Sequence, residues 1–334
     1  MNKRHIAWIT TNRACNLRCK WCYARATNFS NKNQLTLPLL KSILTLLKPF
    51  PIKNLVLIGG EPTIHPQFLD FLSVIREQKY SFSLVTNGLV FKDNVFLKKS
   101  IALGLKNISL SLKAPSNDKY REWTGVSALT DFSKAVENIR KNNLAVMLSL
   151  VITTELIPYI QDLIYLLKDL KIDKIHLDAE RPAVEENTIS YETNIATLLS
   201  GVKKVINALE KNKINYDFKA SFPFCLYPHN FLNNLKKKGL LKSACQMVCA
   251  SGLVFDTNGD LLACNQLCNY PLAVYGKDFK ENYDLLKLIS SKEITEFYQK
   301  MASYPNIKCK NCPEWAECGG GCRINWLYKN MLTN

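Results

Sequence analysis

The chain lacks any apolar run long enough to cross a membrane. A helix that spans a bilayer needs about 20 consecutive apolar residues, and no run in these 334 residues approaches that length. The opening stretch, residues 1–9, is basic and then apolar, but its apolar part is far too short for a secretory signal and no cleavage pattern follows it. These absences predict a cytoplasmic protein without a membrane partner.

Acidic side chains are few in comparison with basic ones. The chain holds 28 Asp and Glu against 44 Lys and Arg, which gives a formal net charge of +16. Such an excess is typical of lysine-rich helix faces in water, and it also favours an acidic partner such as a peptide, a phosphate or a nucleic acid. A nucleic-acid binder gathers its basic and aromatic residues on one face, whereas here the basic residues are spread throughout. The sequence therefore argues against nucleic acid as a partner.

Cysteine, in contrast, is abundant, with 12 residues. A reducing cytoplasm disfavours disulfides, and the clustering of the cysteines indicates metal or iron–sulfur binding instead. Hydrophobic residues make up 47% of the chain and charged residues 22%, a composition that supports an ordinary soluble core. The length suits one large α/β domain and a smaller second domain.

Residues 1–180 alternate between short apolar runs and amphipathic stretches. The runs are rich in β-branched residues, as expected of buried parallel strands, and Thr36 followed by Pro38 marks the start of one intervening helix. Strands that alternate with helices imply a parallel sheet, and six such units are fewer than the eight of a closed barrel. We predict an α/β fold built as a partial (βα)6 TIM-like barrel. The six predicted strands are Ile6–Thr11, Leu55–Gly60, Phe82–Asn87, Ile108–Lys113, Val146–Thr153 and Ile175–Asp178.

The rest of the chain divides into three parts. Residues 192–212 form a further predicted helix, so that the barrel domain covers 1–213. Residues 214–244 lose clear periodicity and carry two prolines and a run of three lysines, which favours a linker. Residues 245–334 hold eight of the twelve cysteines. We predict that they form a small cysteine-rich iron–sulfur domain, stabilised by metal ligation as much as by apolar burial.

Three cysteines, Cys15, Cys19 and Cys22, follow the first predicted strand with the spacing C-x3-C-x2-C. Three thiolates can hold three irons of a cubic 4Fe–4S cluster and leave the fourth iron open, and sites with an open position tend to be catalytic. Zinc or a redox thiol pair is the alternative, but zinc usually takes four ligands and the only nearby imidazole, His5, precedes the strand. We expect the loop at the carboxyl edge of the sheet, where ligand sites of parallel α/β folds gather.

These features resemble the radical S-adenosylmethionine (SAM) enzymes, over roughly the first half of the chain. Trp21 precedes the last cysteine of the loop, Gly59-Gly60-Glu61-Pro62 ends the second strand like the family's GGEP turn, and Thr86-Asn87-Gly88 ends the third strand. One departure is Lys113, which stands where the family usually has an acidic residue. The resemblance implies that SAM is bound by Gly59, Gly60, Glu61, Pro62 and Asn87 at the turns, by Ser109 and Ser111 at its ribose, and by Val151 and Ile152 at its adenine.

The resemblance also implies the chemistry. The open iron chelates the amino and carboxylate groups of SAM, and one electron from the reduced cluster cleaves the C–S bond. The resulting 5′-deoxyadenosyl radical removes a hydrogen atom from the substrate, while the protein positions the reactants and tunes the cluster. A reductant such as flavodoxin or ferredoxin is the implied partner.

A second cysteine pattern occupies the tail, where four cysteines follow the spacing C-x2-C-x5-C-x3-C. Upstream, Cys249 is followed after nine residues by Gly259 and after four more by Cys264. The combined pattern resembles the SPASM domain, which carries auxiliary 4Fe–4S clusters, and a zinc ribbon is the competing interpretation. The resemblance implies two auxiliary clusters, the first held by Cys245, Cys249, Cys264 and Cys322 and the second by Cys309, Cys312 and Cys318.

The second auxiliary cluster lacks a fourth ligand in this pattern. The family takes that ligand from a cysteine beyond the last C-x3-C, and no cysteine follows Cys322. Cys268 or Cys225 could supply it from upstream, with Cys268 preferred, or the cluster is incomplete or open to substrate. Both thiols are also catalytic candidates, as donors of a hydrogen atom to a carbon radical, and a buried apolar role is the plain alternative. Asp178, at the end of the sixth strand, is the candidate general acid or base.

Enzymes of the SPASM type share a scaffold and differ in reaction. We expect a peptide substrate, a ribosomal precursor that is crosslinked, oxidised or epimerised, and a small metabolite is the alternative. Formylglycine-type sulfatase maturation is disfavoured, because Asn265 stands where those enzymes usually have an aspartate. A ferredoxin would need neither the six βα units nor an open cluster. A zinc-containing nucleic-acid binder would gather its basic residues on one face.

Overall fold

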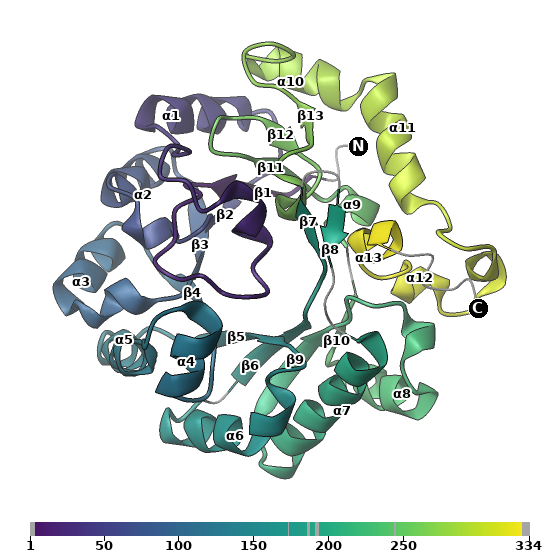
Figure 1. Cartoon of the computed structure of the whole chain (residues 1–334). Helices are drawn as coiled ribbons and strands as arrows, with labels where there is room; N and C mark the ends of the chain where they lie inside the picture. The colour runs from purple at the N-terminus through teal and green to yellow at the C-terminus, as the bar shows by residue number, and fades with distance from the viewer. Residues whose placement is uncertain (1–3, 173, 186–187, 191–193, 244, 329–334) are drawn as a thin grey trace.

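One curved sheet of 11 strands, surrounded by helices, forms the centre of the molecule (Figure 1). The structure, a computed structural model, describes residues 4–172, 174–185, 188–190, 194–243 and 245–328. The strand order is β10-β9-β6-β5-β4-β3-β2-β1-β11-β12-β13, and the sheet bends into an incomplete barrel, which confirms the predicted fold class. The six predicted strands are present as β1 (Ile6–Thr10), β2 (Asn54–Ile58), β3 (Ser81–Thr86), β4 (Asn107–Leu112), β5 (Met147–Ile152) and β6 (Lys174–Ala179).

Strands β3 to β6 each have one buried face and one half-open face. Their burial alternates residue by residue, because successive side chains of a strand point to opposite faces. In β4, Leu110 and Leu112 are 0% and 1% exposed and belong to the apolar core, whereas Ser109 and Ser111 are half-buried on the opposite, inner face. The apolar core therefore lies between the sheet and the helices, and the polar inner face is left for a ligand.

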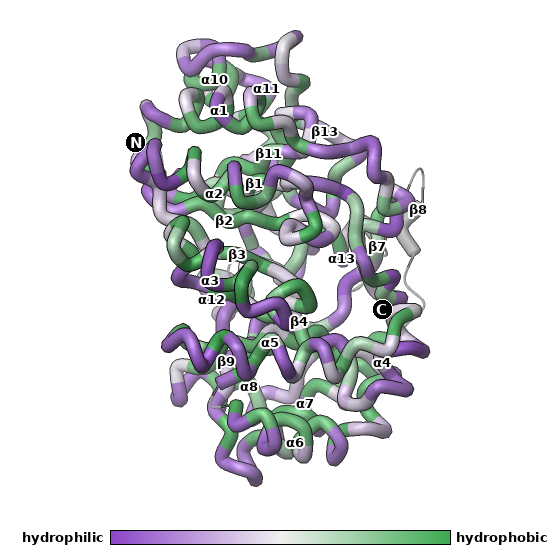
Figure 2. The backbone as a smooth tube through the Cα atoms, turned by 90° about the vertical axis from the view of Figure 1, so that its left-hand side faces the viewer, coloured by the Kyte–Doolittle hydropathy of each residue, from purple (hydrophilic) through white to green (hydrophobic). Residues whose placement is uncertain are grey.

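Helices cover the outer face of the sheet, and apolar and polar stretches alternate along them (Figure 2). The hydroxyl of Thr36 accepts a hydrogen bond from the Leu39 amide at the first turn of α1, where Pro38 also lies, as the sequence predicts. The helix predicted over 192–212 is present as α7. The covering helices are α1 (Leu37–Leu46), α2 (Phe68–Glu77), α3 (Asn94–Ala102), α4 (Asn117–Thr124), α5 (Leu129–Lys141), α6 (Ile160–Asp169), α7 (Ile195–Lys211) and α8 (His229–Lys237).

The segment 214–244 differs from the predicted linker. It forms β9 (Asn215–Lys219), η5 (Phe224–Leu226), α8 and β10 (Leu241–Lys242), and β9 pairs in parallel with β6. Two aromatic residues, Tyr216 and Phe218, alternate with polar ones and are buried against the core. This alternation is typical of a short strand. The strand was not predicted because only two of its five residues are apolar. The barrel sheet therefore continues past residue 213, and the division of the chain into domains stays a prediction.

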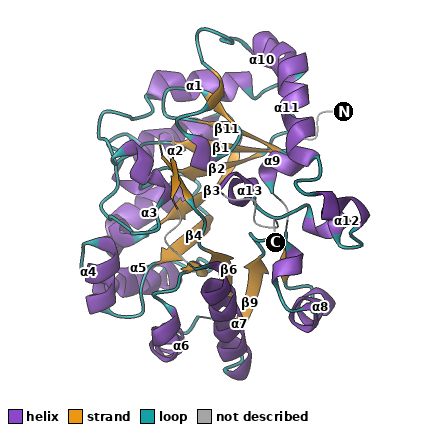
Figure 3. Ribbon diagram, turned by 45° about the vertical axis from the view of Figure 1, so that its right-hand side comes forward, coloured by secondary structure: helices purple, strands orange, loops and turns teal. Residues whose placement is uncertain are grey.

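The cysteine-rich region also joins the sheet. β11 (Gly252–Phe255) pairs in parallel with β1, and β12 (Leu261–Leu262) and β13 (Pro271–Ala273) follow in antiparallel order. Figures 1 and 3 show α9, α12 and α13 on the side where the sheet stays open. The helices of this region are α9 (Gln246–Cys249), α10 (Asn282–Ile289), α11 (Lys292–Ala302), α12 (Trp315–Cys318) and α13 (Arg323–Tyr328).

Short elements complete the fold. β7 (Ala183–Glu185) and β8 (Thr188–Ser190) pair in antiparallel order. No helix in the described residues is long and apolar enough to cross a membrane, and the cytoplasmic location stays a prediction. The 3-10 helices are η1 (Tyr23–Thr27), η2 (Pro62–Ile64), η3 (Leu89–Lys92), η4 (Ile157–Tyr159), η5, η6 (Asn265–Leu267) and η7 (Ile307–Asn311).

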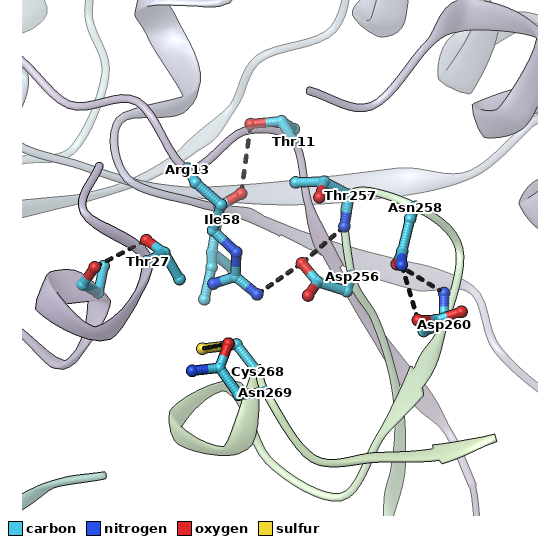
Figure 4. Close-up of polar contacts among 11 residues, drawn as sticks. Thr11, Arg13, Thr27, Ile58, Asp256, Thr257, Asn258, Asp260, Cys268 and Asn269 are labelled. Atoms are coloured by element: carbon cyan, nitrogen blue, oxygen red, sulfur yellow. Dashed lines mark hydrogen bonds and ion pairs between the residues drawn. The ribbon is translucent and has the colours of Figure 1, made fainter. Parts of the chain in front are cut away.

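A buried ion pair ties the loop after β1 to the turn after β11 (Figure 4). Nη2 of Arg13 lies 2.5 Å from Oδ1 of Asp256, and the two side chains are 2% and 12% exposed. The same carboxylate oxygen accepts a hydrogen bond from the Thr257 amide at 2.6 Å. The pair joins the first cysteine loop to the cysteine-rich region, across more than 240 positions of sequence.

We predict that Asp256→Ala lowers the free energy of unfolding by about 3–5 kcal/mol, because it leaves the Arg13 guanidinium buried without its counter-charge. Chemical denaturation of the whole chain measures the change. Lys92→Ala is the control, since Lys92 pairs with Asp131 at the surface, where the side chains are 53% and 40% exposed, and should cost less than about 1 kcal/mol. Equal losses in the two variants would contradict the role given to the buried pair.

Candidate active site

The loop that carries Cys15, Cys19 and Cys22 begins directly after β1, at the carboxyl edge of the sheet. The turn after β2 holds its backbone through two hydrogen bonds of 2.8 Å, from the Gly60 amide to the Asn12 carbonyl and from the Glu61 amide to the Ala14 carbonyl. The far end of the loop is held by α4, where the Thr124 carbonyl accepts from the amide of Arg18 at 2.8 Å. Three neighbouring elements therefore fix the positions of the thiols.

Two glycines make the close approach of this loop possible. A Cβ atom on Gly59 would lie 2.6 Å from the Asn12 carbonyl oxygen, and one on Gly60 would lie 2.2 Å from that of Ala14. Both distances are far below van der Waals contact. The resemblance assigns these glycines to the binding of SAM, but the atoms that approach them in this structure are those of the cysteine loop.

Glu61 and Asn87 brace the same loop. The Glu61 carboxylate is 1% exposed and accepts hydrogen bonds from the Thr86 hydroxyl at 2.6 Å and from the Asn87 amide at 2.7 Å. The Asn87 side chain donates to Oδ1 of Asn16, inside the cysteine loop, at 2.7 Å. Glu61 therefore acts in this structure as a positioning residue that couples the turns after β2 and β3 to the loop, and its predicted contact with SAM stays a prediction.

The three thiols form a donor set that fits a 4Fe–4S cluster with one open iron. Burial, followed by the charges of Glu61, Cys19 and Cys22, raises the pKa of Cys15 to about 12. Burial also raises the pKa of Cys19, which the positive charge of Lys113 opposes. Among the described residues, no three His, Cys, Asp or Glu side chains converge on a single ion. In a 4Fe–4S cluster each iron takes one thiolate, so three thiols leave one iron without a protein ligand.

The inner face of the sheet carries the residues predicted to contact the rest of SAM, with one exception. Ser109, Ser111 and Val151 lie on the half-buried face of β4 and β5. Ile152 is 0% exposed and belongs to the apolar core behind the sheet, because adjacent residues of a strand point to opposite sides. The structure therefore brings Val151, but not Ile152, to the candidate site.

A polar row that the sequence analysis missed crosses the same face. Ser111, Ser149, His176 and Asp217 lie opposite one another on four adjacent strands. Nδ1 of His176 contacts Oδ1 of Asp217. Burial raises the pKa of Asp217, but the hydrogen bonds and charges of His176 and Lys174 outweigh it, so that the pKa is lowered. The alternation of polar residues in β6 was the signal for this row, and its partner Asp217 lay in the predicted linker.

Asp178, the predicted acid or base, lies at the end of β6 in an ion pair with Arg181. The pair leaves Oδ1 of Asp178 and Nε of Arg181 buried, and among the described residues neither atom has a hydrogen-bond partner. The hydroxyl of Tyr227 is also buried without a hydrogen-bond partner among the described residues. Its pKa is raised by burial and by the charge of Asp178. Buried polar atoms without partners cost about 1–3 kcal/mol each, so a polar molecule bound here, water included, would stabilise this group. The catalytic role of Asp178 stays a prediction.

The cysteines of the second half form two groups. Cys245, Cys264 and Cys322 pack against a small apolar cluster. Burial, together with the charges of the other two thiols, raises the pKa of Cys322 to about 12. Cys249 ends α9, one turn after Cys245, and the two cysteines line a cavity of about 430 Å³ together with Cys318. The space and the thiols beside it fit a cluster.

Cys309, Cys312 and Cys318 form the other group. Burial raises the pKa values of Cys309 and Cys318, and neighbouring thiols of this set raise them further, which indicates that the three thiols lie near one another. Cys225 lies with this group. Cys268 lies elsewhere, near Arg13 and Asp256 (Figure 4). The preference for Cys268 as a ligand of the second group therefore finds no support in the structure.

Known proteins share both the sequence pattern and the fold. Residues 9–167 match the Radical SAM superfamily. GTP 3′,8-cyclase of Clostridium perfringens (strain 13 / Type A) is 28% identical over 178 residues, which are 52% of this chain and 51% of that protein. The chain thus spans about half the length of this curated relative.

Two solved structures match nearly the whole chain. SuiB of Streptococcus suis bound to the precursor peptide SuiA has a TM-score of 0.69 at 20% identity, covering 98% of this chain and 74% of that one. Native anSMEcpe with bound AdoMet has a TM-score of 0.72 at 17% identity, covering 96% and 89%. At such identities the likeness shows the fold, and the fold includes the cysteine-rich region.

We predict that Gly60→Ala destabilises the chain by about 3 kcal/mol, at the upper end for overpacking, because the new methyl group meets backbone carbonyls that cannot rotate away. The measurement is the free energy of unfolding of the whole chain, together with the iron bound after anaerobic reconstitution. Gly239→Ala is the control: its φ is +66° and nothing lies within 4 Å of the added Cβ, so only the backbone strain of about 1–2 kcal/mol applies. A Gly60→Ala variant as stable as this control would show that the close approach is soft.

Proposed function

Because this chain carries a radical SAM domain, we propose that it is an enzyme that cleaves SAM reductively and removes a hydrogen atom from a peptide. The bound cluster and SAM supply the electron transfer and the hydrogen-abstracting group. The protein supplies a loop held in place by its neighbours, a half-buried inner face and a polar site at the end of β6. A flavodoxin or ferredoxin is the proposed source of electrons.

Cys15, Cys19 and Cys22 would hold the SAM-binding cluster. The turns after β2 and β3 would support them, with Gly59 to Pro62 and Asn87 next to the methionine end of SAM. Ser109, Ser111 and Val151 would line the nucleoside. The support for these roles is the position of the residues: all of them lie in the loops at the carboxyl edge or on the inner face of β4 and β5.

The two thiol groups of the second half would hold auxiliary clusters. Cys245, Cys249, Cys264 and Cys322 are the proposed ligands of the first, beside the cavity that Cys245 and Cys249 line. Arg181 lies in electrostatic contact with Cys264 and Cys322. Its positive charge, held in place by Asp178, would favour a reduced, more negative cluster at this position.

The proposal of a peptide substrate is supported by the similarity in fold over nearly the whole chain. Both matched structures extend over the cysteine-rich region, and the SuiB structure contains its precursor peptide. A related structure of anSMEcpe contains a peptide as well, with a TM-score of 0.70 at 18% identity. In this chain, the unpartnered buried atoms of Asp178, Arg181 and Tyr227 offer both acceptors and donors, which suits the amide groups of a peptide.

A small molecule is the second candidate substrate. The sequence relatives that overlap the barrel include GTP 3′,8-cyclases and a Fe-coproporphyrin III synthase. Two half-buried lysines, Lys113 and Lys219, follow or end strands of the sheet. Basic side chains at such a position suit a phosphorylated substrate. The two candidates differ in the molecule that should stimulate SAM cleavage.

We predict that Cys19→Ala abolishes the formation of 5′-deoxyadenosine, because two thiolates do not retain the cluster. The assay is anaerobic: reconstituted protein, SAM and dithionite, with 5′-deoxyadenosine measured by chromatography and mass spectrometry. Cys312→Ala is the matched variant, since it alters only the tail, and it should keep part of the SAM cleavage while product is lost. Wild-type protein that forms no 5′-deoxyadenosine would refute the proposed function.

The substrate is tested in the same assay. Peptides encoded by short reading frames beside the gene are compared with GTP. A peptide that increases 5′-deoxyadenosine formation and itself loses hydrogen supports the first proposal. Stimulation by GTP alone would overturn the peptide assignment and leave the radical chemistry intact.

A further inference from the structure

We propose that Cys225 is the fourth ligand of a 4Fe–4S cluster that Cys309, Cys312 and Cys318 hold in the tail. The ligand then comes from η5, at the open edge of the barrel. The grouping of these four thiols follows from the contacts of this chain. The identity of the metal rests on the proposed function, which assigns iron–sulfur clusters to the cysteine-rich region.

The backbone next to Cys225 is docked on the tail. The amide of Phe224 donates a hydrogen bond to Sγ of Cys318 at 3.3 Å, in a buried position. Four residues further along the tail, the amide of Cys322 donates to the carbonyl of Ser221 at 2.8 Å. These two bonds align residues 221–225 with residues 318–322, so that Cys225 is anchored within one residue of a direct contact with a tail thiol.

The tail passes so close to this segment that a side chain would not fit between them. A Cβ atom on Gly321 would lie 2.7 Å from the Ser221 carbonyl oxygen and 2.8 Å from the Phe222 carbonyl carbon. The Asn325 side chain donates a further hydrogen bond to the same Ser221 carbonyl at 2.8 Å. The position of Cys225 relative to the tail is therefore set by backbone contacts and not by a flexible side chain.

The thiols themselves lie within electrostatic reach of one another. The pKa of Cys225 is raised by burial and then by Cys318, Cys309 and Cys312, which are the three cysteines of the tail group. Cys225 is exposed and Cys309 and Cys312 are half-buried, so the group opens to solvent, from which iron and sulfide can enter. The amide that points at Cys318 is the kind of N–H···S bond that tunes such clusters.

Cys268, the other candidate, is excluded by its surroundings. Its pKa is raised mainly by burial, and the charges that act on it are those of Arg13 and Asp256. Figure 4 shows it beside this buried ion pair, with Sγ turned toward Asn269. Arg13 belongs to the first cysteine loop, so Cys268 lies on the side of the SAM-binding site.

Four thiolates leave no iron of the cluster open. A closed cluster passes electrons and does not bind substrate. The group in the tail would therefore serve electron transfer, and the proposed substrate site stays at the inner face of the sheet. This excludes the incomplete or substrate-binding second cluster that the sequence pattern left open.

The experiment counts metal in the whole chain. Cys19→Ala serves as the background, because it removes the SAM-binding cluster from the count. After anaerobic reconstitution, adding Cys225→Ala should lower the iron and the acid-labile sulfide by about four atoms per chain, or convert one cluster into a three-iron form that electron paramagnetic resonance detects. Adding Cys268→Ala to the same background should leave both counts unchanged.

Unchanged iron and an unchanged spectrum after Cys225→Ala would overturn the proposal, as would a loss of zinc in place of iron. Because Cys225 is exposed, alanine leaves no cavity at this position. Cys225→Ser is a second variant that keeps an oxygen ligand, and it should shift the spectrum of one cluster only; a spectrum identical to that of the background would also refute the proposal. Metal counts do not depend on SAM cleavage, so a failure of the proposed function is recognised separately, by the absence of 5′-deoxyadenosine in the wild-type assay.

Discussion

The site depends on the contact between two stretches of backbone, the cysteine loop after β1 and the glycine turn after β2. Two amide–carbonyl hydrogen bonds of 2.8 Å join them, and the absent side chains of Gly59 and Gly60 leave the room for this approach. A loop on its own would place three thiols at variable distances. The bonds to the turn connect the loop to the sheet and restrict its motion. A reactive metal site requires ligands whose positions are restricted in this way.

The residues around this contact form a supporting layer. Glu61 accepts hydrogen bonds from the turn after β3, Asn87 donates to the loop, and Arg13 reaches Asp256 in the cysteine-rich region. Sequence motifs that the resemblance connects with the cofactor thus also hold the cysteine loop in place. The pair of Arg13 and Asp256 also joins the cysteine loop to the cysteine-rich region, whose strand β11 extends the barrel sheet beside β1.

Because side chains alternate along the strands, the sheet has one face for the apolar core and one polar face. Leucines and isoleucines of β4 and β5 pack against the helices, and serines, His176 and Asp217 form the polar inner face. The same alternation separates Val151 from Ile152. The cysteine loop after β1 lies at one end of this face, and the thiols of the tail lie beside the open edge of the sheet (Figure 1).

The sequence by itself determined the six strands, the cysteine spacing and the two glycine and asparagine turns, because each is a local pattern of a few residues. The tertiary structure alone decided what depends on strand order. β9 joined β6 although its five residues contain only two apolar side chains, and this pairing brought Asp217 to His176. The choice between Cys225 and Cys268 rested on which cysteine the folded tail reaches. Spacing along the chain carries no information on such contacts, since they are made by segments about 90 residues apart that meet only in the folded structure.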